Sequence, residues 1–394
     1  MTKHKLPKGF LTSGIHCGAK KKRKDLSLFF SKKPCRIAAL FTKNKVKAAP
    51  VLLAQEQLAK TKTVHAVLVN SGNANCMTGR RGMQDAKRMV QAAARKLKVS
   101  EKEVLVSSTG VIGQFMPMNP ILKGIPRLVS HLSEHGLIDA ADGILTTDKF
   151  HKIACKTFTL GGKDITLTGV AKGAGMIDPN MATMLCYILT DVNISPGALK
   201  KALKAGNEIS FNAITVDGDM STNDTVMIMS NGESGNKMVK GRGKDYEVFL
   251  ENLNEVMNKL AGMIVHDGEG ATKFVQIKVK GAKTKKDAKL AAEAIANSLL
   301  TKCAVHGGDP NWGRVASSVG SSGAAVDPDK IEIKLDGLVF FANGTAKMPS
   351  GKETVFKSKN VGIEVNLHLG RAEATVYTCD ISKKYITLNA HYTT

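Results

Sequence analysis

Strand-like runs and amphipathic helical runs alternate along the whole of this 394-residue chain. Runs rich in Val, Ile and Thr predict strands, and runs with apolar residues three or four positions apart predict helices. We expect strands at 63–70, 104–108, 164–170, 224–230 and 273–279, and helices at 83–98, 119–135, 196–207, 244–265 and 287–302. The C-terminal part reads as further strands at 331–337, 338–344, 362–370, 373–380 and 385–390.

The order of these runs limits the fold class. Strands follow one another as well as alternating with helices, which favours α+β layers over a regular βαβ series. The length allows one large core or two, and we expect two. We find no internal repeat of 20–50 residues and no linker-like segment. The prediction is therefore an α+β protein in which helices cover sheets.

The stretch GAGMIDPNMATMLCYILTD (173–191) changes from a loop-like to a strand-like composition near Thr183. A glycine-rich loop with Asp-Pro-Asn ends near Met181, and an apolar run with strand propensity begins at Thr183. Such a threonine can act as an N-terminal nucleophile if the bond before it is cut. The alternative is a structural threonine at the start of a strand, and these residues alone leave both open.

The chemistry of such a cut is straightforward. The Thr183 hydroxyl attacks the carbonyl of Ala182, the resulting ester is hydrolysed, and an α-amine is freed beside the same hydroxyl. That amine has a reference pKa of about 7.7–8.0, so it can serve as the base. Gly173 and Gly175 would let the preceding loop adopt a strained geometry.

Two other motifs are candidate functional elements. In SSTGVIG (107–113), Thr109 and the backbone N–H of Gly110 could form an oxyanion hole after a strand, although a plain strand-ending turn is the alternative. In HDGEGATKF (266–274), the carboxylate of Glu269 could bind a substrate ammonium, although a solvated turn acid is the alternative.

HLSEH at 131–135 matches a zinc-protease pattern, with His131 and His135 one helical turn apart. Gly136 would end that helix at once, and histidines near a helix C-terminus are favourable for dipole reasons alone. We therefore expect no metal site.

The net charge of +23 is concentrated near the N-terminus, where KKKRK occupies 20–24. A run of this kind can contact nucleic-acid phosphates. Its bases are mostly lysine and no aromatic residues are interleaved, so a solvated face is favoured. We see no apolar run long enough to span a membrane and no secretory signal, and seven scattered cysteines read as reduced thiols. The expected location is cytoplasmic.

Together these segments resemble the ornithine acetyltransferase (glutamate N-acetyltransferase) family of arginine biosynthesis. The resemblance runs along nearly the whole chain and rests on many ordered motifs. These are GFLTSGIHCGAKKKRKDLSLFFS, FTKNKVKAAPV, NSGNANCMTG, SSTGVIGQFMPM, ILTTD, AKGAGMIDPNMATML, FNAITVDGDMSTNDT, DGEGATKF, HGGDPNWGR and YITLNAHYTT.

The resemblance implies a layered N-terminal-nucleophile fold and self-cleavage between Ala182 and Thr183. Residues 1–182 would form an α chain with the oxyanion-hole residues, and 183–394 a β chain that begins with the nucleophile. The two would assemble as an α2β2 heterotetramer. No cofactor is implied.

The resemblance also implies a ping-pong reaction in which Thr183 takes an acetyl group from N-acetylornithine and glutamate then removes it. Thr109 and Gly110 correspond to the oxyanion hole. The substrate contacts correspond to Thr146, Lys172, Thr183, Glu269, Asn389 and Thr394, with Thr147 as an alternative to its neighbour Thr146. A cation such as Lys172 near the new amine would lower the pKa of that amine and keep it neutral.

Several points stay open at this stage. The sequence does not decide whether acetyl-CoA is a second acetyl donor. The nearest rival is an amidase or aminopeptidase of related fold that uses Thr183 but delivers the acyl group to water.

Overall fold

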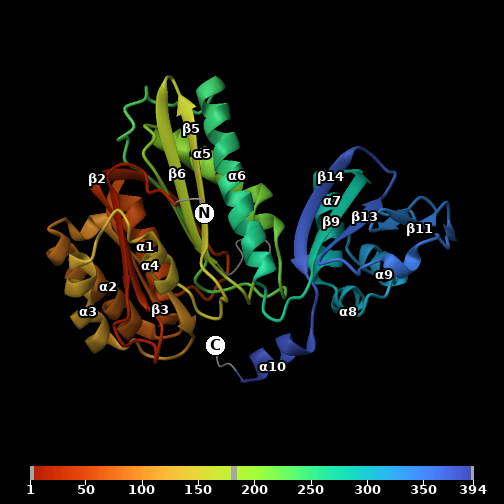
Figure 1. The fold of residues 1–394 in the computed structure, drawn as a ribbon, viewed down its shortest axis with the longest axis horizontal. Helices are drawn as coiled ribbons and strands as arrows, with labels where there is room; N and C mark the ends of the chain where they lie inside the picture. Colours follow the sequence, from red (N-terminus) through yellow and green to blue (C-terminus); the bar gives the residue numbers. More distant parts are fainter. Residues whose placement is uncertain (1–3, 179–183, 392–394) are drawn as a thin grey trace.

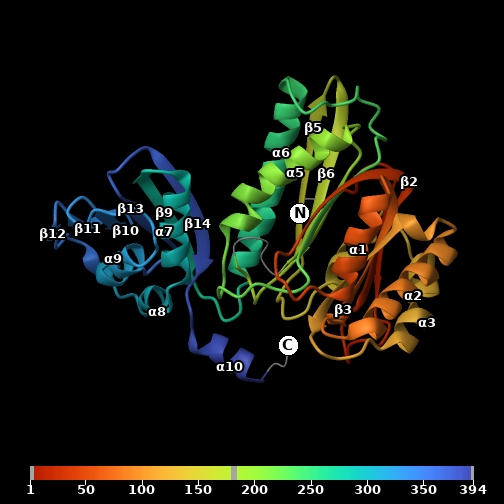
Figure 2. The ribbon, with the colours of Figure 1, turned by 180° about the vertical axis from the view of Figure 1, so that it is seen from behind.

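The computed structural model describes residues 4–178 and 184–391. The proposed cleavage residues Ala182 and Thr183, and the substrate residue Thr394, lie outside the described residues. The chain forms a large lobe built on an eight-stranded sheet and a small lobe built on a six-stranded sheet (Figure 1). Figure 2 shows the same division from behind.

The large sheet mixes parallel and antiparallel strands. Its order is β4 (Val104–Val111), β3 (Thr63–Asn73), β2 (Leu26–Phe41), β8 (Thr225–Ser230), β7 (Leu185–Thr190), β6 (Lys163–Lys172) and β5 (Lys152–Leu160), with β1 (Phe10–Ile15) paired to β2. β7 and β8 run parallel, with Leu185 opposite Thr225. Both come after position 183 yet lie in the middle of this sheet, so the predicted chain boundary falls inside the large lobe.

Helices cover both sides of the large sheet. α6 (Lys244–His266) packs beside β5 and β6, and α5 (Pro196–Ile209) packs against α6 and β2. α1 (Ala49–Lys60), α2 (Gly79–Leu97), α3 (Met118–Ser130) and α4 (Leu137–Gly143) gather around the strands at the β2 and β3 side of the sheet (Figures 1 and 2). The apolar face of α6, including Val256 and Leu260, is buried in one continuous core with Ile188 of β7. This burial is the main stabilising term for such helices.

The small lobe has its own aliphatic core. Its sheet order is β12 (Thr345–Ala346), β11 (Leu338–Ala342), β10 (Glu332–Leu335), β13 (Asn360–Asn366), β9 (Phe274–Ala282) and β14 (Ala372–Cys379), with α7 (Lys285–Asn297), α8 (Leu299–Gly307) and α9 (Trp312–Gly320) packed against it. Asn297 links the lobes, because it accepts a hydrogen bond from Thr215 (2.7 Å) and donates one to Asp178 (3.4 Å).

The α+β prediction is confirmed, and most predicted elements match the structure. Two helix predictions need correction. The helix expected at 119–135 ends at Ser130, so HLSEH does not lie on a helical face. The helix expected at 287–302 is two helices, because Ser298 leaves helical geometry and accepts a hydrogen bond from Thr301 N as the N-cap of α8.

The strand expected at 385–390 is wrong, because this segment lies within α10 (Lys383–His391). The β-branched and aromatic residues there favour a strand locally. As a helix, however, the segment places Tyr385 and Asn389 one turn apart, so both reach the large lobe. α10 leaves the small lobe after β14 and extends below both lobes (Figures 1 and 2).

Candidate active site

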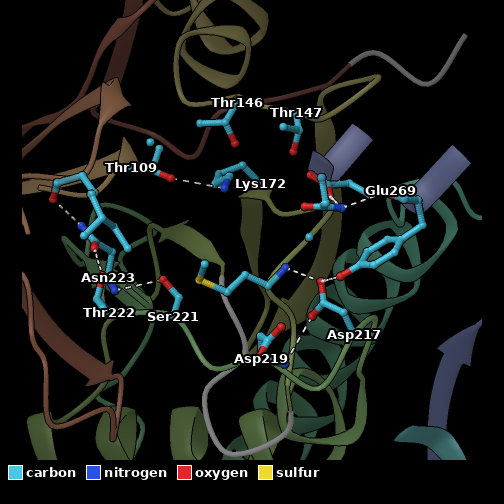
Figure 3. A pocket seen from close by; sticks show the side chains of 17 residues that line it. Thr109, Thr146, Thr147, Lys172, Asp217, Asp219, Ser221, Thr222, Asn223 and Glu269 are labelled. Atoms are coloured by element: carbon cyan, nitrogen blue, oxygen red, sulfur yellow. Dashed lines mark hydrogen bonds between the residues drawn. The ribbon is translucent and has the colours of Figure 1, made fainter. Parts of the chain in front are cut away.

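One pocket, with about 190 Å³ of open space, brings most of the predicted site residues together (Figure 3). The described residues predicted from sequence all line it: Thr109, Gly110, Thr146, Lys172, Glu269 and Asn389. The other lining residues are Ala74, Ile112, Thr147, Gly175, Met176, Asp217, Asp219, Ser221, Thr222, Asn223 and Tyr385. These residues come from the large lobe, from the turn before β9 and from α10.

Thr109 and Gly110 lie at the end of β4, where β4 pairs with β3. Gly110 has φ +133°, and a Cβ at this position would lie 2.3 Å from the backbone carbonyl carbon of Gly72. Only glycine fits such a close approach of two backbones. The Thr109 hydroxyl accepts a hydrogen bond from Lys172 Nζ (3.3 Å), so the end of β4 and the end of β6 meet in the pocket.

Lys172 is the last residue of β6 and is only 4% exposed. It pairs with Leu185 of β7, which places it beside the start of the strand that follows the predicted cleavage site. Burial lowers the pKa of Lys172, and Asp148 opposes that shift. The pocket therefore holds a lysine that loses its proton more readily than a surface lysine.

A buried ion network supports this wall of the pocket. Lys152 Nζ lies 2.7 Å from Asp148 Oδ1 and 2.6 Å from Asp267 Oδ2. Asp148 also accepts the backbone N–H groups of Gly173 (2.7 Å) and Thr146 (3.0 Å). Burial pushes the pKa of Asp148 up, but Lys152 and Lys172 outweigh it and hold the pKa below its ordinary value. This carboxylate therefore positions two pocket segments at once.

Glu269 and Asn389 form the opposite side. Asn389 Nδ2 donates to Glu269 Oε2 (2.9 Å), which ties α10 to the turn before β9. A Cβ at Gly175 would lie 2.5 Å from the Glu269 carboxyl carbon, so the glycine-rich loop must pass directly against this carboxylate. Glu269 N also donates to Ala174 O (2.8 Å), which fixes the same contact from the backbone.

The sequence reasoning missed the run 217–223 on the pocket floor. Asp217 accepts the backbone N–H groups of Met176 (2.6 Å) and Ile177 (2.8 Å), and the Tyr385 hydroxyl donates to it (3.3 Å). Burial raises the pKa of Asp217. The available signal was the unusually polar run TVDGDMSTND directly before a buried strand.

The pocket is lined by both Thr146 and Thr147, and both face into it in Figure 3. The choice between them as the substrate contact thus stays a prediction. Thr183, Ala182 and Thr394 stay predictions as well, since they lie outside the described residues.

The alternative sites receive little structural support. His131 and His135 are exposed, and His131 Nδ1 lies 2.7 Å from the Arg127 carbonyl. Within 4–178 and 184–391, no group of three or more His, Cys, Asp or Glu side chains is placed to hold a metal. In the same ranges no helix is long and apolar enough to cross a membrane. In the basic run, Lys21, Lys22 and Arg23 are exposed.

Comparisons with known proteins agree with the sequence resemblance. Residues 11–394 match the sequence profile of the ArgJ family. The chain is 49% identical over 393 residues to the arginine biosynthesis bifunctional protein ArgJ of Geobacter sulfurreducens, covering 98% of this chain and 99% of the relative. It is 46% identical over 402 residues to the protein of the same name from Caldanaerobacter subterraneus, covering 100% and 98%.

A solved structure of the arginine biosynthesis bifunctional protein ArgJ from Bacillus halodurans is also similar. It is 36% identical, with a TM-score of 0.51. The match covers 98% of that solved chain but 52% of this one. The solved chain thus corresponds to about half of the present sequence.

Proposed function

Because the chain belongs to the ArgJ family, we propose that it is an acetyltransferase of arginine biosynthesis that moves an acetyl group from N-acetyl-L-ornithine to L-glutamate. The observation that carries the proposal is the single pocket lined by Thr109, Gly110, Thr146, Lys172, Glu269 and Asn389. Segments far apart in the sequence contribute to it, and the family resemblance implies a role in the site for each of these residues.

In the proposed reaction, the Thr183 hydroxyl attacks the acetyl carbonyl of N-acetylornithine. A C–O bond forms, the amide C–N bond breaks, and the amine of ornithine leaves with the proton taken from the hydroxyl. The amine of glutamate then attacks the acetyl ester, which gives N-acetylglutamate and returns the proton to Thr183. An amide is a poor acyl donor, so a covalent step combined with charge stabilisation is the expected strategy.

The described residues have complementary roles in this scheme. Thr109 and the Gly110 N–H stabilise the oxyanion, a contribution of roughly 3–4 kcal/mol for one donor. Lys172 lies next to Thr109 and, as a cation, keeps the pKa of the new α-amine low. Glu269 binds a substrate ammonium group, and Asn389 orients the Glu269 carboxylate.

Self-cleavage between Ala182 and Thr183 is part of the proposal, with residues 1–182 and 183–394 remaining together. The position of β7 and β8 in the middle of the large sheet supports this, because both fragments would contribute strands to one sheet. A solved relative whose chain corresponds to about half of this one is also what a cleaved protein would produce. An α2β2 assembly and a cytoplasmic location complete the proposal.

The relatives are named bifunctional, which supports a second activity. We propose acetyl-CoA as the second donor, with glutamate again as the acceptor. The rival reading, an amidase that passes the acetyl group to water, predicts free acetate in the absence of glutamate.

The test combines intact mass spectrometry with product analysis. The purified protein should show two fragments that separate between Ala182 and Thr183, and should form N-acetylglutamate from N-acetylornithine. Thr183→Ala should remain one 42.1 kDa chain without transfer activity. Thr157→Ala, at an exposed position of β5, serves as the control and should behave like the wild type. An uncleaved chain with full transferase activity would refute the nucleophile, and acetate release without glutamate would favour the amidase.

A further inference from the structure

Asp380 is a buried carboxylate that ties together two segments of the chain. It directly follows β14, is 2% exposed and is not among the residues that line the pocket. Its Oδ1 accepts the backbone N–H groups of Thr272 and Lys273 (both 2.8 Å), and its Oδ2 accepts the Thr272 hydroxyl (2.5 Å). The Lys273 carbonyl in turn accepts the backbone N–H of Asp380 (3.3 Å). Asp380 therefore clamps the turn before β9 to the end of β14.

A further partner completes the hydrogen bonds of Asp380. His306, near the end of α8, places its Nδ1 2.7 Å from Asp380 Oδ2. Burial pushes the pKa of Asp380 up, but the hydroxyl and backbone N–H of Thr272, together with His306 and the Lys273 N–H, outweigh it and hold the pKa below its ordinary value. The carboxylate is therefore ionised at neutral pH, and hydrogen bonds to a charged acceptor are the stronger kind.

Each of the two clamped segments carries a residue that lines the pocket. In the turn before β9 this residue is Glu269, which precedes Thr272. In the other segment it is Asn389 on α10, a helix that begins at Lys383, just after Asp380. α10 leaves the small lobe directly after β14 (Figure 1). The clamp therefore lies where both segments depart towards the pocket.

Further hydrogen bonds join the same two segments between the clamp and the pocket. The buried Ser382 hydroxyl donates to the Gly270 carbonyl (2.6 Å). At the pocket itself, Asn389 Nδ2 donates to Glu269 Oε2 (2.9 Å). The contacts of Asp380, Ser382 and Asn389 thus form one series along the two segments. A shift of one segment against the other at Asp380 would displace Glu269 relative to Asn389.

We infer that Asp380 is a positioning residue for substrate binding, because it holds Glu269 and Asn389 in place relative to each other. The inference rests on the proposed function, in which Glu269 binds a substrate ammonium group, and it adds a residue to which the family resemblance assigned no role. Asp380 acts through Glu269, and no bond is made or broken at it. Loss of its charge should therefore weaken substrate binding and leave the chemical step nearly unchanged.

The first test compares Asp380→Asn with the wild type and with Asp336→Asn. Asp336 is a control of the same kind, because its carboxylate also accepts two backbone N–H groups of the small lobe, those of Phe356 and Gly362 (both 2.7 Å), and none of these three residues lines the pocket. Steady-state formation of N-acetylglutamate gives kcat and KM. We expect D380N to raise the KM for N-acetylornithine roughly tenfold with kcat within about twofold of the wild type, and D336N to change neither constant.

A double-mutant cycle with Asn389→Ala separates positioning from a general loss of structure. If Asp380 acts through the contact between Asn389 and Glu269, that contact is already lost in N389A. The KM of D380N/N389A should then stay close to that of N389A alone. A general structural effect of D380N would instead multiply the two increases in KM, because independent effects on the free energy add.

Each outcome decides the matter. A raised KM in D380N that does not multiply with the effect of N389A supports the inference. A folded D380N with the wild-type KM overturns it, and so do multiplied effects in the double variant. If D380N does not fold, Thr272→Val tests the same clamp, since it removes only the hydroxyl donor to Asp380 Oδ2; a raised KM in T272V supports the inference and an unchanged KM overturns it. A wild-type protein that forms no N-acetylglutamate refutes the proposed function itself.

Discussion

The buried lysines of the two lobes have different kinds of partners. In the large lobe, Lys152 lies between Asp148 and Asp267, and Lys172 lies close to the same network. In the small lobe, Lys302 is 3% exposed and donates to the Thr378 hydroxyl (2.6 Å) and the Cys379 carbonyl (2.7 Å), which are neutral. The buried lysines near the pocket thus lie close to carboxylates, whereas the buried lysine of the small lobe is hydrogen-bonded to neutral oxygens.

The comparison extends to how each lobe contributes to the pocket. The large lobe supplies strand ends and loops from its own sheet. The small lobe supplies no residue from its sheet among those that line the pocket; Glu269 precedes it, and Tyr385 and Asn389 follow it on α10. The small lobe therefore contributes to the pocket through the two segments that flank it in sequence, and the other lining residues come from the large lobe.

The strongest test of this contrast is Asp148→Asn. Loss of this charge leaves Lys152 and Lys172 with less compensation in a fully buried site, so the free energy of unfolding should fall by roughly 3–5 kcal/mol. Urea denaturation of the folded protein measures the change. Asp139→Asn, at an exposed ion pair with Lys24, should cost less than about 1 kcal/mol. An equally small loss in D148N would show that the network is not needed for the fold.

The next largest effect concerns catalysis in the large lobe. Thr109→Val keeps the shape but removes the hydroxyl, so kcat should fall by about 100- to 1000-fold while the stability changes little. Steady-state kinetics with N-acetylornithine and glutamate provide the measurement. Thr109→Ser retains the hydroxyl and should recover most of the activity. A loss below about fivefold in T109V would remove Thr109 from the proposed oxyanion hole.

A smaller effect is expected from the flank of the small lobe. Asn389→Ala removes the donor to Glu269, so the KM for the amino-acid substrate should rise roughly tenfold with little change in kcat. Thr387→Ala, exposed on the same helix, is the control and should leave both constants unchanged. A fall in kcat in N389A would instead show that α10 also affects the chemical step and not only substrate binding through Glu269.

The smallest effect is a pH dependence of stability in the small lobe. Burial lowers the pKa of Lys302 in the folded state, so the unfolded chain binds more protons at this site. Stability should therefore rise with pH from the lowered folded pKa up to the ordinary lysine value of about 10.4. Lys302→Met should flatten that rise, and Lys286→Met, at an exposed position, should not. Urea unfolding at several alkaline pH values tests this, and an unchanged slope in K302M would contradict it.

Local sequence patterns predicted the amphipathic helices correctly, but they failed for the segment 385–390, whose structure depends on tertiary contacts. The predicted helices at 196–207 and 244–265 correspond to α5 and α6. Their apolar residues recur at helical spacing, so a helix buries all of them on one face. Residues 385–390 were predicted as a strand from their composition. They form a helix, in which Tyr385 and Asn389 lie one turn apart and donate hydrogen bonds to Asp217 and Glu269.

The sequence by itself determined the fold class and, through the family resemblance, six described residues that line one pocket. Only the tertiary structure revealed the run 217–223 on the pocket floor and the buried carboxylate of Asp224 beside the start of β7. The physical reason is that hydrophobic periodicity reports which face of an element is buried, whereas the pairing of β7 with β8 depends on which distant strands meet. That choice is made by the packing of the whole sheet, and it brings Met184 and Asp224, 40 positions apart in the sequence, into hydrogen-bond contact.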